Sequence, residues 1–346
     1  MSDYDQLLME NMKSEIFSVP VAAENYRYIL RKKRSAIQQS AIEIHEKRPS
    51  HILFLGSGAS MCVLHLGKYF LDKYSALNAE LLTGPEYLTR KPPRMKTDNT
   101  FAIVASYSGS TKDTLDGVHW LQKLEIPYLV ITKDTSTKIA QQCQRVLTYD
   151  SKTLYTGAAF ELYLLLTFLL KMRREFREHK TFLNDLQALP RHNEDSATKA
   201  KELGKSIGKA LQNEDPIYVI ADGVNLGLGY QIAYTTIMEY LKRNAAFIRA
   251  CEFRHGPLEV VKEGQPAMLF LLGADESRPY CETTFNFCRR HGAKVYRMDV
   301  NYLFDTQPLL SPLVLFPATQ WMLLQMATDS GINLDKYLYM HVVPYE

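Results

Sequence analysis

The chain has few cysteines, little net charge and no apolar run long enough to span a bilayer. Its five cysteines are odd in number and form no C-x-x-C pair, which argues against a disulfide framework and for a reducing compartment. The 41 basic and 38 acidic residues balance to +3, so no strong field attracts nucleic acid or an anionic membrane. The longest apolar run extends only from Leu162 to Leu170, and the acidic start Met1–Asp5 is unlike a secretory signal. We therefore expect a cytoplasmic protein that binds neither nucleic acid nor membrane.

The sequence does contain a repeated alternation of apolar runs and helical patterns. His51–Leu55 and Thr100–Ala105 are continuous apolar runs, typical of strands that are buried on both faces of a parallel sheet. Each run leads into a Gly- and Ser-rich turn and then into a helical pattern, and Tyr128–Thr132 is the next expected strand. This order predicts an α/β fold with helices on both faces of a parallel sheet.

The second half repeats the arrangement. Pro216–Ala221 is an expected strand, residues 228–242 an expected helix, and further strands are expected at 246–250, 268–272 and 294–298. A chain of 346 residues should hold about two domains, so we expect two doubly wound parallel sheets in tandem. The expected divisions are an N-terminal helical segment, a first domain, a linker helix and a second domain, at residues 1–45, 46–175, 176–205 and 206–346.

Residues 106–111, Ser-Tyr-Ser-Gly-Ser-Thr, form a hydroxyl-rich turn between an expected strand and an expected helix. The free N–H groups and the dipole at a helix N-terminus attract an anion, and hydroxyls add donors without adding charge. Helix caps favour Ser and Thr in any case, but four hydroxyls in six residues exceed the need of one cap. We predict a phosphate-binding turn whose candidate residues are Ser106, Tyr107, Ser108 and Thr111.

An earlier turn, Gly56-Ser57-Gly58-Ala59-Ser60, follows the first expected strand. It is not a dinucleotide-binding fingerprint, because Met61 stands where the third glycine would be, and the chain has no P-loop lysine pattern. The nine histidines show no metal-ligand spacing. We interpret the turn as a second wall of the phosphate site, with Ser60 offering a hydroxyl, and expect neither metal nor cofactor.

Glu239 lies on one face of the expected helix with Ile232, Thr235 and Thr236, at seven-, four- and three-residue spacings. A carboxyl group on an inward face tends to have a raised pKa, which suits a general base near neutral pH. The alternative is a structural ion pair with Lys242 or Arg243.

Residues 252–259, Glu-Phe-Arg-His-Gly-Pro-Leu-Glu, place two carboxylates, a guanidinium and an imidazole on a loop, because Gly-Pro ends any helix. His255 can exchange protons with a sugar oxygen near neutral pH. Glu252 and Arg254 are candidates for contacts with an amine or sugar group. The alternative is a solvated, charged turn.

At these residues the sequence resembles the sugar isomerase (SIS) family of phosphosugar-binding domains in its tandem form. The family's phosphate turn, S-x-S-G-x-T, matches residues 106–111, and the serine that ends its first-strand turn matches Ser60. Its catalytic Glu and the His of its E-x-[KR]-H-G-P loop match Glu239 and His255. The resemblance runs from about residue 45 to the end of the chain. It implies two SIS domains in tandem, each a flavodoxin-like three-layer sandwich.

Within that family the chain is more similar to the fructosamine-6-phosphate deglycases than to the isomerase module of glucosamine-6-phosphate synthase. Residues 252–259 and 270–278 are closely similar to the deglycase branch, as is the chain length, whereas the first Gly turn is less close. The synthase module's lysine three residues before the catalytic Glu is replaced by Thr236, and its lysine near the C-terminus has no counterpart here.

The resemblance implies cleavage of a fructosamine 6-phosphate, such as fructoselysine 6-phosphate, to glucose 6-phosphate and a free amine. Glu239 would move protons between sugar carbons, and His255 would open the ring or exchange hydroxyl protons. A homodimer with shared active sites is also implied. Three alternatives stay open: a glucoselysine-6-phosphate deglycase, an aldose–ketose phosphosugar isomerase, and a non-catalytic phosphosugar sensor.

Overall fold

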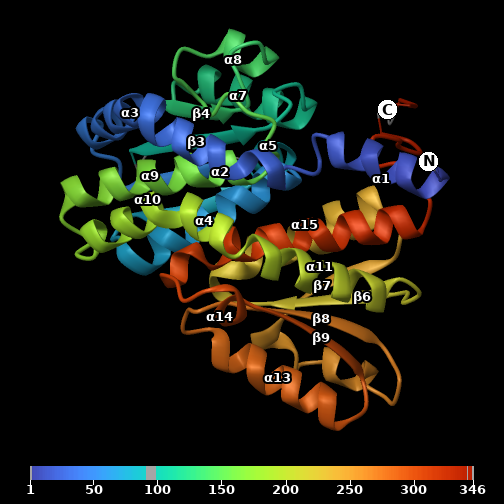
Figure 1. Ribbon diagram of the computed structural model, residues 1–346. Helices are drawn as coiled ribbons and strands as arrows, with labels where there is room; N and C mark the ends of the chain where they lie inside the picture. Colours follow the sequence, from blue (N-terminus) through green and yellow to red (C-terminus); the bar gives the residue numbers. More distant parts are fainter. Residues whose placement is uncertain (1, 91–98, 341, 345–346) are drawn as a thin grey trace. The chain divides into compact units, whose positions relative to one another are not determined.

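The computed structural model describes residues 2–90, 99–340 and 342–344, and it divides into two compact units (Figure 1). One unit holds Val21–Pro190, and the other holds Met1–Pro20 together with Arg191–Glu346. The division falls at Pro190, inside helix α10 (His179–Asp195). The residues expected to form one N-terminal helical segment are thus shared between the two units, and the four divisions drawn from the sequence stay a prediction.

The Val21–Pro190 unit, here called the five-stranded unit, contains a parallel sheet of order β2-β1-β3-β4-β5. Every residue of β1 and β3 is buried, as their continuous apolar composition predicted. The edge strand β2 is less buried than β1 and β3, and it carries the polar residues Asn78 and Glu80. The strands are β1 (His51–Leu55), β2 (Asn78–Leu82), β3 (Thr100–Ser106), β4 (Tyr128–Thr132) and β5 (Val146–Thr148).

Helices cover both faces of this sheet (Figure 1). On one face α9 packs against α3 and α4, and on the other α5 and α7 enclose a core with the strands. Nearly the whole circumference of α9 is buried, because it lies between the sheet and the outer helices. The helices of this unit are α2 (Val19–Tyr28), η1 (Ile29–Lys33), α3 (Arg34–Glu46), α4 (Ala59–Tyr74), α5 (Gly84–Arg90), α7 (Lys112–Lys123), α8 (Lys138–Gln142) and α9 (Thr156–Arg173).

The other unit, here called the four-stranded unit, contains a parallel sheet of order β7-β6-β8-β9 between α13 on one face and α11 with α15 on the other (Figure 1). The helices α11 and α15 pack closely because Gly204 has no side chain; a Cβ there would lie 2.3 Å from the carbonyl oxygen of Ala318. The main elements are α1 (Asp3–Lys13), α11 (Ala197–Leu211), β6 (Ile217–Ala221), α12 (Leu226–Tyr230), η3 (Gln231–Tyr240), β7 (Ala245–Arg249), β8 (Ala267–Leu272), α13 (Arg278–Arg290), β9 (Lys294–Asp299), α14 (Val300–Leu303) and α15 (Ser311–Asp329).

The strand orders place a topological switch point in each sheet. After β1 the chain adds β2 on one side and β3 on the other, and after β6 it adds β7 and β8 in the same way. Ligands of such folds bind outside the carboxyl ends of the strands at this point. The predicted α/β fold with two doubly wound parallel sheets is confirmed.

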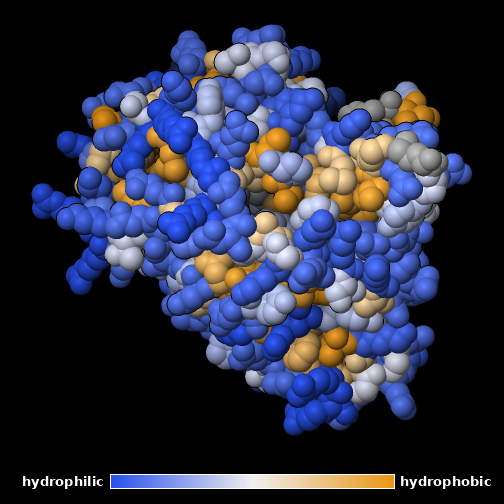
Figure 2. Space-filling model, in the orientation of Figure 1, coloured by the Kyte–Doolittle hydropathy of each residue, from blue (hydrophilic) through white to orange (hydrophobic). Residues whose placement is uncertain are grey.

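The segment Pro308–Asp329, which includes α15, is long and apolar enough to cross a membrane. It is a longer apolar segment than Leu162–Leu170, the longest run identified from the sequence. Its most apolar stretch is 94% buried inside the protein, as in the core helix of a soluble protein. The molecular face drawn in Figure 2 is mostly hydrophilic. We conclude that this segment owes its composition to the core of the four-stranded unit.

Glu161 in α9 is fully buried, and neither of its carboxyl oxygens has a hydrogen-bond partner among the described residues. Burial raises its pKa to about 8, against the opposing effect of Lys33. Because this value lies above the ordinary one, the folded protein should lose stability as the pH rises from about 4.5 to about 8, by about 1.4 kcal/mol for each pKa unit.

We therefore expect Glu161→Gln to reduce the fall in melting temperature between pH 5 and pH 8. Thermal unfolding of both proteins at several pH values measures this difference. Parallel curves for the two proteins would show that Glu161 does not titrate with a raised pKa.

Candidate active site

The turn of residues 106–111 begins where β3 ends. The hydroxyl of Ser106, which is only 4% exposed, accepts a hydrogen bond from the N–H of Gly109 at 3.1 Å. Gly109 has φ 63°, and a Cβ there would lie 2.5 Å from Cβ of Thr137. Glycine is therefore required at this position, and Ser106 serves to shape the turn from inside.

The exposed side of the same turn carries three clustered hydroxyls. Oγ of Ser108 lies 3.2 Å from Oγ of Ser110 and 3.4 Å from Oγ1 of Thr111. Thr111 is the N-cap residue of α7, but its side chain makes no capping hydrogen bond. Hydroxyl donors and the N-terminus of a twelve-residue helix thus face solvent together, which is an arrangement suited to an anion with several oxygens.

Ser60 connects this turn with the turn after β1. Its hydroxyl, in the first turn of α4, accepts a hydrogen bond from the N–H of Tyr107 at 3.2 Å. Leu55 of β1 and Val104 of β3 are paired, so the two turns leave neighbouring strands at the switch point. The structure therefore brings together the five residues that the sequence assigned to a phosphate site: Ser60, Ser106, Tyr107, Ser108 and Thr111.

Lys133 stands at the same edge of the sheet and was not singled out from the sequence. It follows β4 directly, and its Nζ lies 5.1 Å from the centre of the Tyr107 ring. Thr132 fixes this part of β4 by donating a hydrogen bond from Oγ1 to the carbonyl of Ser106 at 2.7 Å. The signal in the sequence was a lysine immediately after a buried strand, next to the strand that leads into the hydroxyl turn.

Glu239 lies near the end of η3, which is a π-helix where the sequence predicted part of an ordinary helix. The N–H of Leu241 donates to the carbonyl of Thr236, five residues earlier. The side chain of Glu239 is half-buried, and burial raises its pKa to about 7 although Lys242 acts in the opposite direction.

The alternative of a structural ion pair at Glu239 receives no support from its neighbours. Nζ of Lys242 donates to the carbonyls of Tyr240 and Lys336, and the guanidinium of Arg243 donates to the carbonyls of Leu211, Gln212 and Glu214. Within the described residues, no ion pair to Glu239 is formed. The raised pKa and the position of Glu239 on the helix face therefore agree with the expected inward-facing carboxyl group.

The loop of residues 252–259 is held at its start by Asp222, a second residue missed from the sequence. Oδ2 of Asp222 accepts a hydrogen bond from the N–H of Cys251 at 2.7 Å, and Oδ1 lies 3.7 Å from Arg249. Phe253 anchors the loop in the core, whereas Glu252, Arg254 and His255 are exposed. The loop therefore presents its charged side chains to solvent from a fixed base.

Glu239 and His255 are separated by strand β7. Glu239 precedes β7 and His255 follows it, so the two residues lie toward opposite ends of this strand. A five-residue strand covers about 13 Å. Among the described residues, no hydrogen bond or ion pair joins the two side chains.

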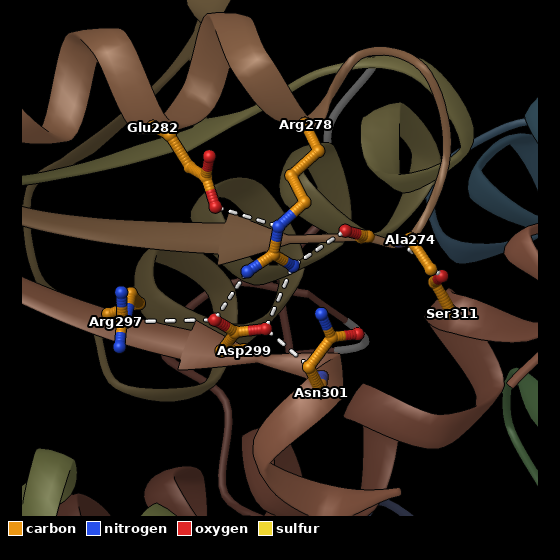
Figure 3. Close-up of polar contacts among 8 residues, drawn as sticks. Ala274, Arg278, Glu282, Arg297, Asp299, Asn301 and Ser311 are labelled. Carbon is orange, nitrogen blue, oxygen red and sulfur yellow. Dashed lines mark hydrogen bonds and ion pairs between the residues drawn. The ribbon is translucent and has the colours of Figure 1, made fainter. Parts of the chain in front are cut away.

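Arg278, at the start of α13, is occupied by structural contacts (Figure 3). Its two terminal nitrogens donate to Asp299 at 2.9 and 2.8 Å, and its Nε donates to Glu282 at 2.8 Å. These contacts hold the loop after β8 to the end of β9. Charge-assisted, two-pronged pairs of this kind are strong, so Arg278 has a role in the fold.

All five cysteines are free thiols. Over residues 2–90, 99–340 and 342–344, no group of three or more His, Cys, Asp and Glu side chains is placed to hold a metal ion.

Comparison with known proteins finds one domain match and several full-length relatives. Residues 43–172 match the model of the SIS domain. The chain is 26% identical to a fructosamine deglycase of Bacillus subtilis (strain 168), over 89% of this chain and 97% of the relative. It is also 26% identical to fructoselysine 6-phosphate deglycase of Escherichia coli (strain K12), over 98% of this chain and 96% of the relative.

A solved structure gives the same result for the fold. A Bacillus subtilis protein, provisionally assigned as a phosphosugar isomerase, superimposes with a TM-score of 0.78 and 25% identity, over 85% of this chain and 92% of that one. Two parallel sheets with switch points, a SIS-domain match and full-length deglycase relatives agree with one another. Residues 43–172 therefore match a SIS domain, and the chain as a whole is similar to deglycases over nearly its entire length.

Proposed function

We propose that this protein is a deglycase that cleaves a fructosamine 6-phosphate, for example fructoselysine 6-phosphate, to glucose 6-phosphate and a free amine. The observation that carries the proposal is Glu239, a half-buried carboxyl group with a pKa of about 7. A general base is most effective when its pKa lies near the working pH. The deglycase relatives, which align over nearly the whole chain, support this substrate class.

The proposed reaction reverses an Amadori rearrangement. Glu239 removes a proton from C1 of the open-chain ketosamine, and the electron pair forms a C1–C2 double bond while the C2 carbonyl oxygen takes up a proton, supplied by His255, and becomes a hydroxyl. The protonated Glu239 then returns a proton to C2, which gives an aldose with an iminium group at C1. Addition of water to C1 and loss of the amine yield glucose 6-phosphate. The substrate supplies its own carbonyl and nitrogen, so these steps need no further electron acceptor.

We place the phosphate of the substrate at the exposed hydroxyls of Ser108 and Thr111 and at the N-terminus of α7. Ser60, Ser106 and Tyr107 support this placement, because their hydrogen bonds fix the turn. Binding energy from a phosphate remote from C1 is expected to position the reacting carbons and so to lower the barrier.

Lys133 would supply the positive charge that the hydroxyl turn lacks. We expect Lys133→Met to raise KM for a phosphosugar about tenfold and to change kcat little, since a partly exposed charge-assisted contact contributes roughly 1.4 kcal/mol. Steady-state kinetics at two salt concentrations would measure this effect. Lys138→Met, which removes the same charge from an exposed position at the start of α8, is the matched control. An equal KM for the two variants would contradict the role of Lys133.

We further propose that the enzyme is a cytoplasmic homodimer in which His255 serves the active site of the partner subunit. His255 is exposed and lies toward the opposite end of β7 from Glu239. A base and an acid that act on one sugar must lie within a few ångströms of it, so His255 would reach a site formed by another copy. Glu252 and Arg254, exposed on the same loop, would then face the amine part of that substrate.

A substrate panel tests the proposal against its alternatives. The purified protein is incubated with fructoselysine 6-phosphate, glucoselysine 6-phosphate and fructose 6-phosphate, and sugar phosphates and free lysine are followed together. Lysine released from the first compound supports the proposal, whereas lysine from the second alone would place the nitrogen on C2. Conversion of fructose 6-phosphate without any lysine release would indicate an isomerase. Binding without turnover of any compound would indicate a sensor.

A further inference from the structure

The C-terminal segment of residues 332–337 is held against the four-stranded unit by α1. Asn11, which is 1% exposed, donates from Nδ2 to the carbonyl of Ile332 and accepts from the N–H of Leu334, both at 2.9 Å. The hydroxyl of Ser14 donates to Oδ1 of Asp335 at 2.6 Å. A buried asparagine that satisfies two backbone groups fixes the path of the chain, because an unpaired buried amide would be costly.

The next two residues of this segment meet the end of the helix that carries Glu239. Nζ of Lys242 donates to the carbonyl of Lys336 at 2.8 Å and to the carbonyl of Tyr240 at 2.9 Å. The same ammonium lies 5.9 Å from the centre of the Tyr337 ring, and the rings of Tyr240 and Tyr337 are 6.5 Å apart. Lys242 thus ties the C-terminal segment to the π-helix beside Glu239.

Three titratable groups interact at this junction. Lys242 lowers the pKa of Glu239, and Glu239 in turn raises that of Lys242, although burial of Lys242 has the larger, opposite effect. Burial and then the carboxylates of Glu239 and Asp335 raise the pKa of Tyr337 to about 12. Among the described residues, Lys242 is the charged group that acts on Glu239. The carboxylate of Glu239 in turn acts on Tyr337, whose ring faces that of Tyr240, the residue after Glu239.

We propose that Lys242 and Tyr337 are positioning residues for Glu239, held in place by the clamp of Asn11 on the C-terminal segment. Lys242 stabilises the ionised carboxylate, and the Tyr337 ring keeps water from it. The two residues therefore act in opposite directions on the protonation of the base. This inference rests on the proposed function, in which Glu239 is the general base.

The test compares the pH dependence of kcat/KM in Lys242→Met and Tyr337→Ala. Without the ammonium, the acid limb of the profile should move about one pH unit upward, which lowers kcat/KM about fivefold at pH 7 and leaves it unchanged at pH 9. Without the ring, the carboxyl group becomes better solvated and the acid limb should move downward. Shifts in opposite directions are not expected from general loosening of the structure.

Two further variants keep the test decisive. Lys209→Met removes a lysine from the exposed face of α11 and should leave the profile unchanged. Lys242→Gln retains an N–H donor for the carbonyls without the charge, and it replaces Lys242→Met if that variant does not fold. Acid limbs at the wild-type position in both Lys242→Gln and Tyr337→Ala would overturn the proposal.

A measurement without substrate separates this inference from the proposed function. In protein labelled with ¹³C at the Glu side-chain carboxyl, the signal lost in Glu239→Gln reports the titration of Glu239. The same opposite shifts of that titration in the Lys242 and Tyr337 variants are expected even if no fructosamine phosphate is turned over. Unshifted titration in an active enzyme would reject the positioning role and leave the deglycase activity standing.

Discussion

Replacing Glu239 by glutamine is expected to lower kcat for fructoselysine 6-phosphate by about three orders of magnitude or more, with KM little changed. The amide retains the size of the side chain but cannot accept the C1 proton, and removal of a general base typically costs 10²–10⁴ in rate. The melting temperature should not fall, since a half-buried carboxyl group with a raised pKa is replaced by a neutral group.

The proton transfer itself can be followed in deuterated water. With the wild-type protein, glucose 6-phosphate formed in D₂O should carry deuterium at C2 wherever the protonated base exchanges with solvent before it reprotonates the sugar. Glu202→Gln, on the exposed face of α11, is the matched control and should behave as wild type. Turnover by Glu239→Gln at the wild-type rate would remove Glu239 from the mechanism.

Replacing Gly109 by alanine is expected to raise KM for any phosphosugar at least about a hundredfold. The new Cβ would lie 2.5 Å from Cβ of Thr137, and the residue would have to keep φ 63°. Such a combination of overpacking and backbone strain costs about 2–4 kcal/mol, so the turn should rearrange and lose its cluster of hydroxyls. Ligand titration and thermal unfolding measure the two consequences.

Gly264→Ala is the matched control for this prediction. Gly264 also has a positive φ, 72°, but nothing lies within 4 Å of a Cβ placed there. This variant should lose about 1 kcal/mol from backbone strain alone and bind the phosphosugar as wild type does. Equal affinities of Gly109→Ala and Gly264→Ala would show that the turn of residues 106–111 does not hold the phosphate.

The central strands were predictable from sequence because burial on both faces leaves a continuous apolar run. The runs His51–Leu55 and Thr100–Ala105 correspond to β1 and β3, in which every residue is buried. The edge strand β2 was not predicted from the sequence, because Asn78 and Glu80 interrupt its apolar residues. A strand at an edge has one open side, so its composition gives a weaker signal.

The candidate site was predictable where its residues are local in sequence. Four hydroxyls in one turn indicated an anion site, and the end of a neighbouring parallel strand indicated Ser60. The π-helix at Glu239 was not predicted, because the spacing of inward-facing residues in the sequence was matched to the 3.6-residue period of an α-helix. The contacts of Lys242 with Lys336 and of Asn11 with Leu334 span 94 and 323 residues, and no local pattern reports such contacts.

The most direct test of the account is the stoichiometry of one reaction: fructoselysine 6-phosphate with the purified protein, sampled over time for glucose 6-phosphate and free lysine. The account predicts that the two products appear together in equal amounts, and that neither appears with Glu239→Gln. A sugar phosphate product that still carries the lysine, or glucose 6-phosphate formed equally fast by Glu239→Gln, would contradict it.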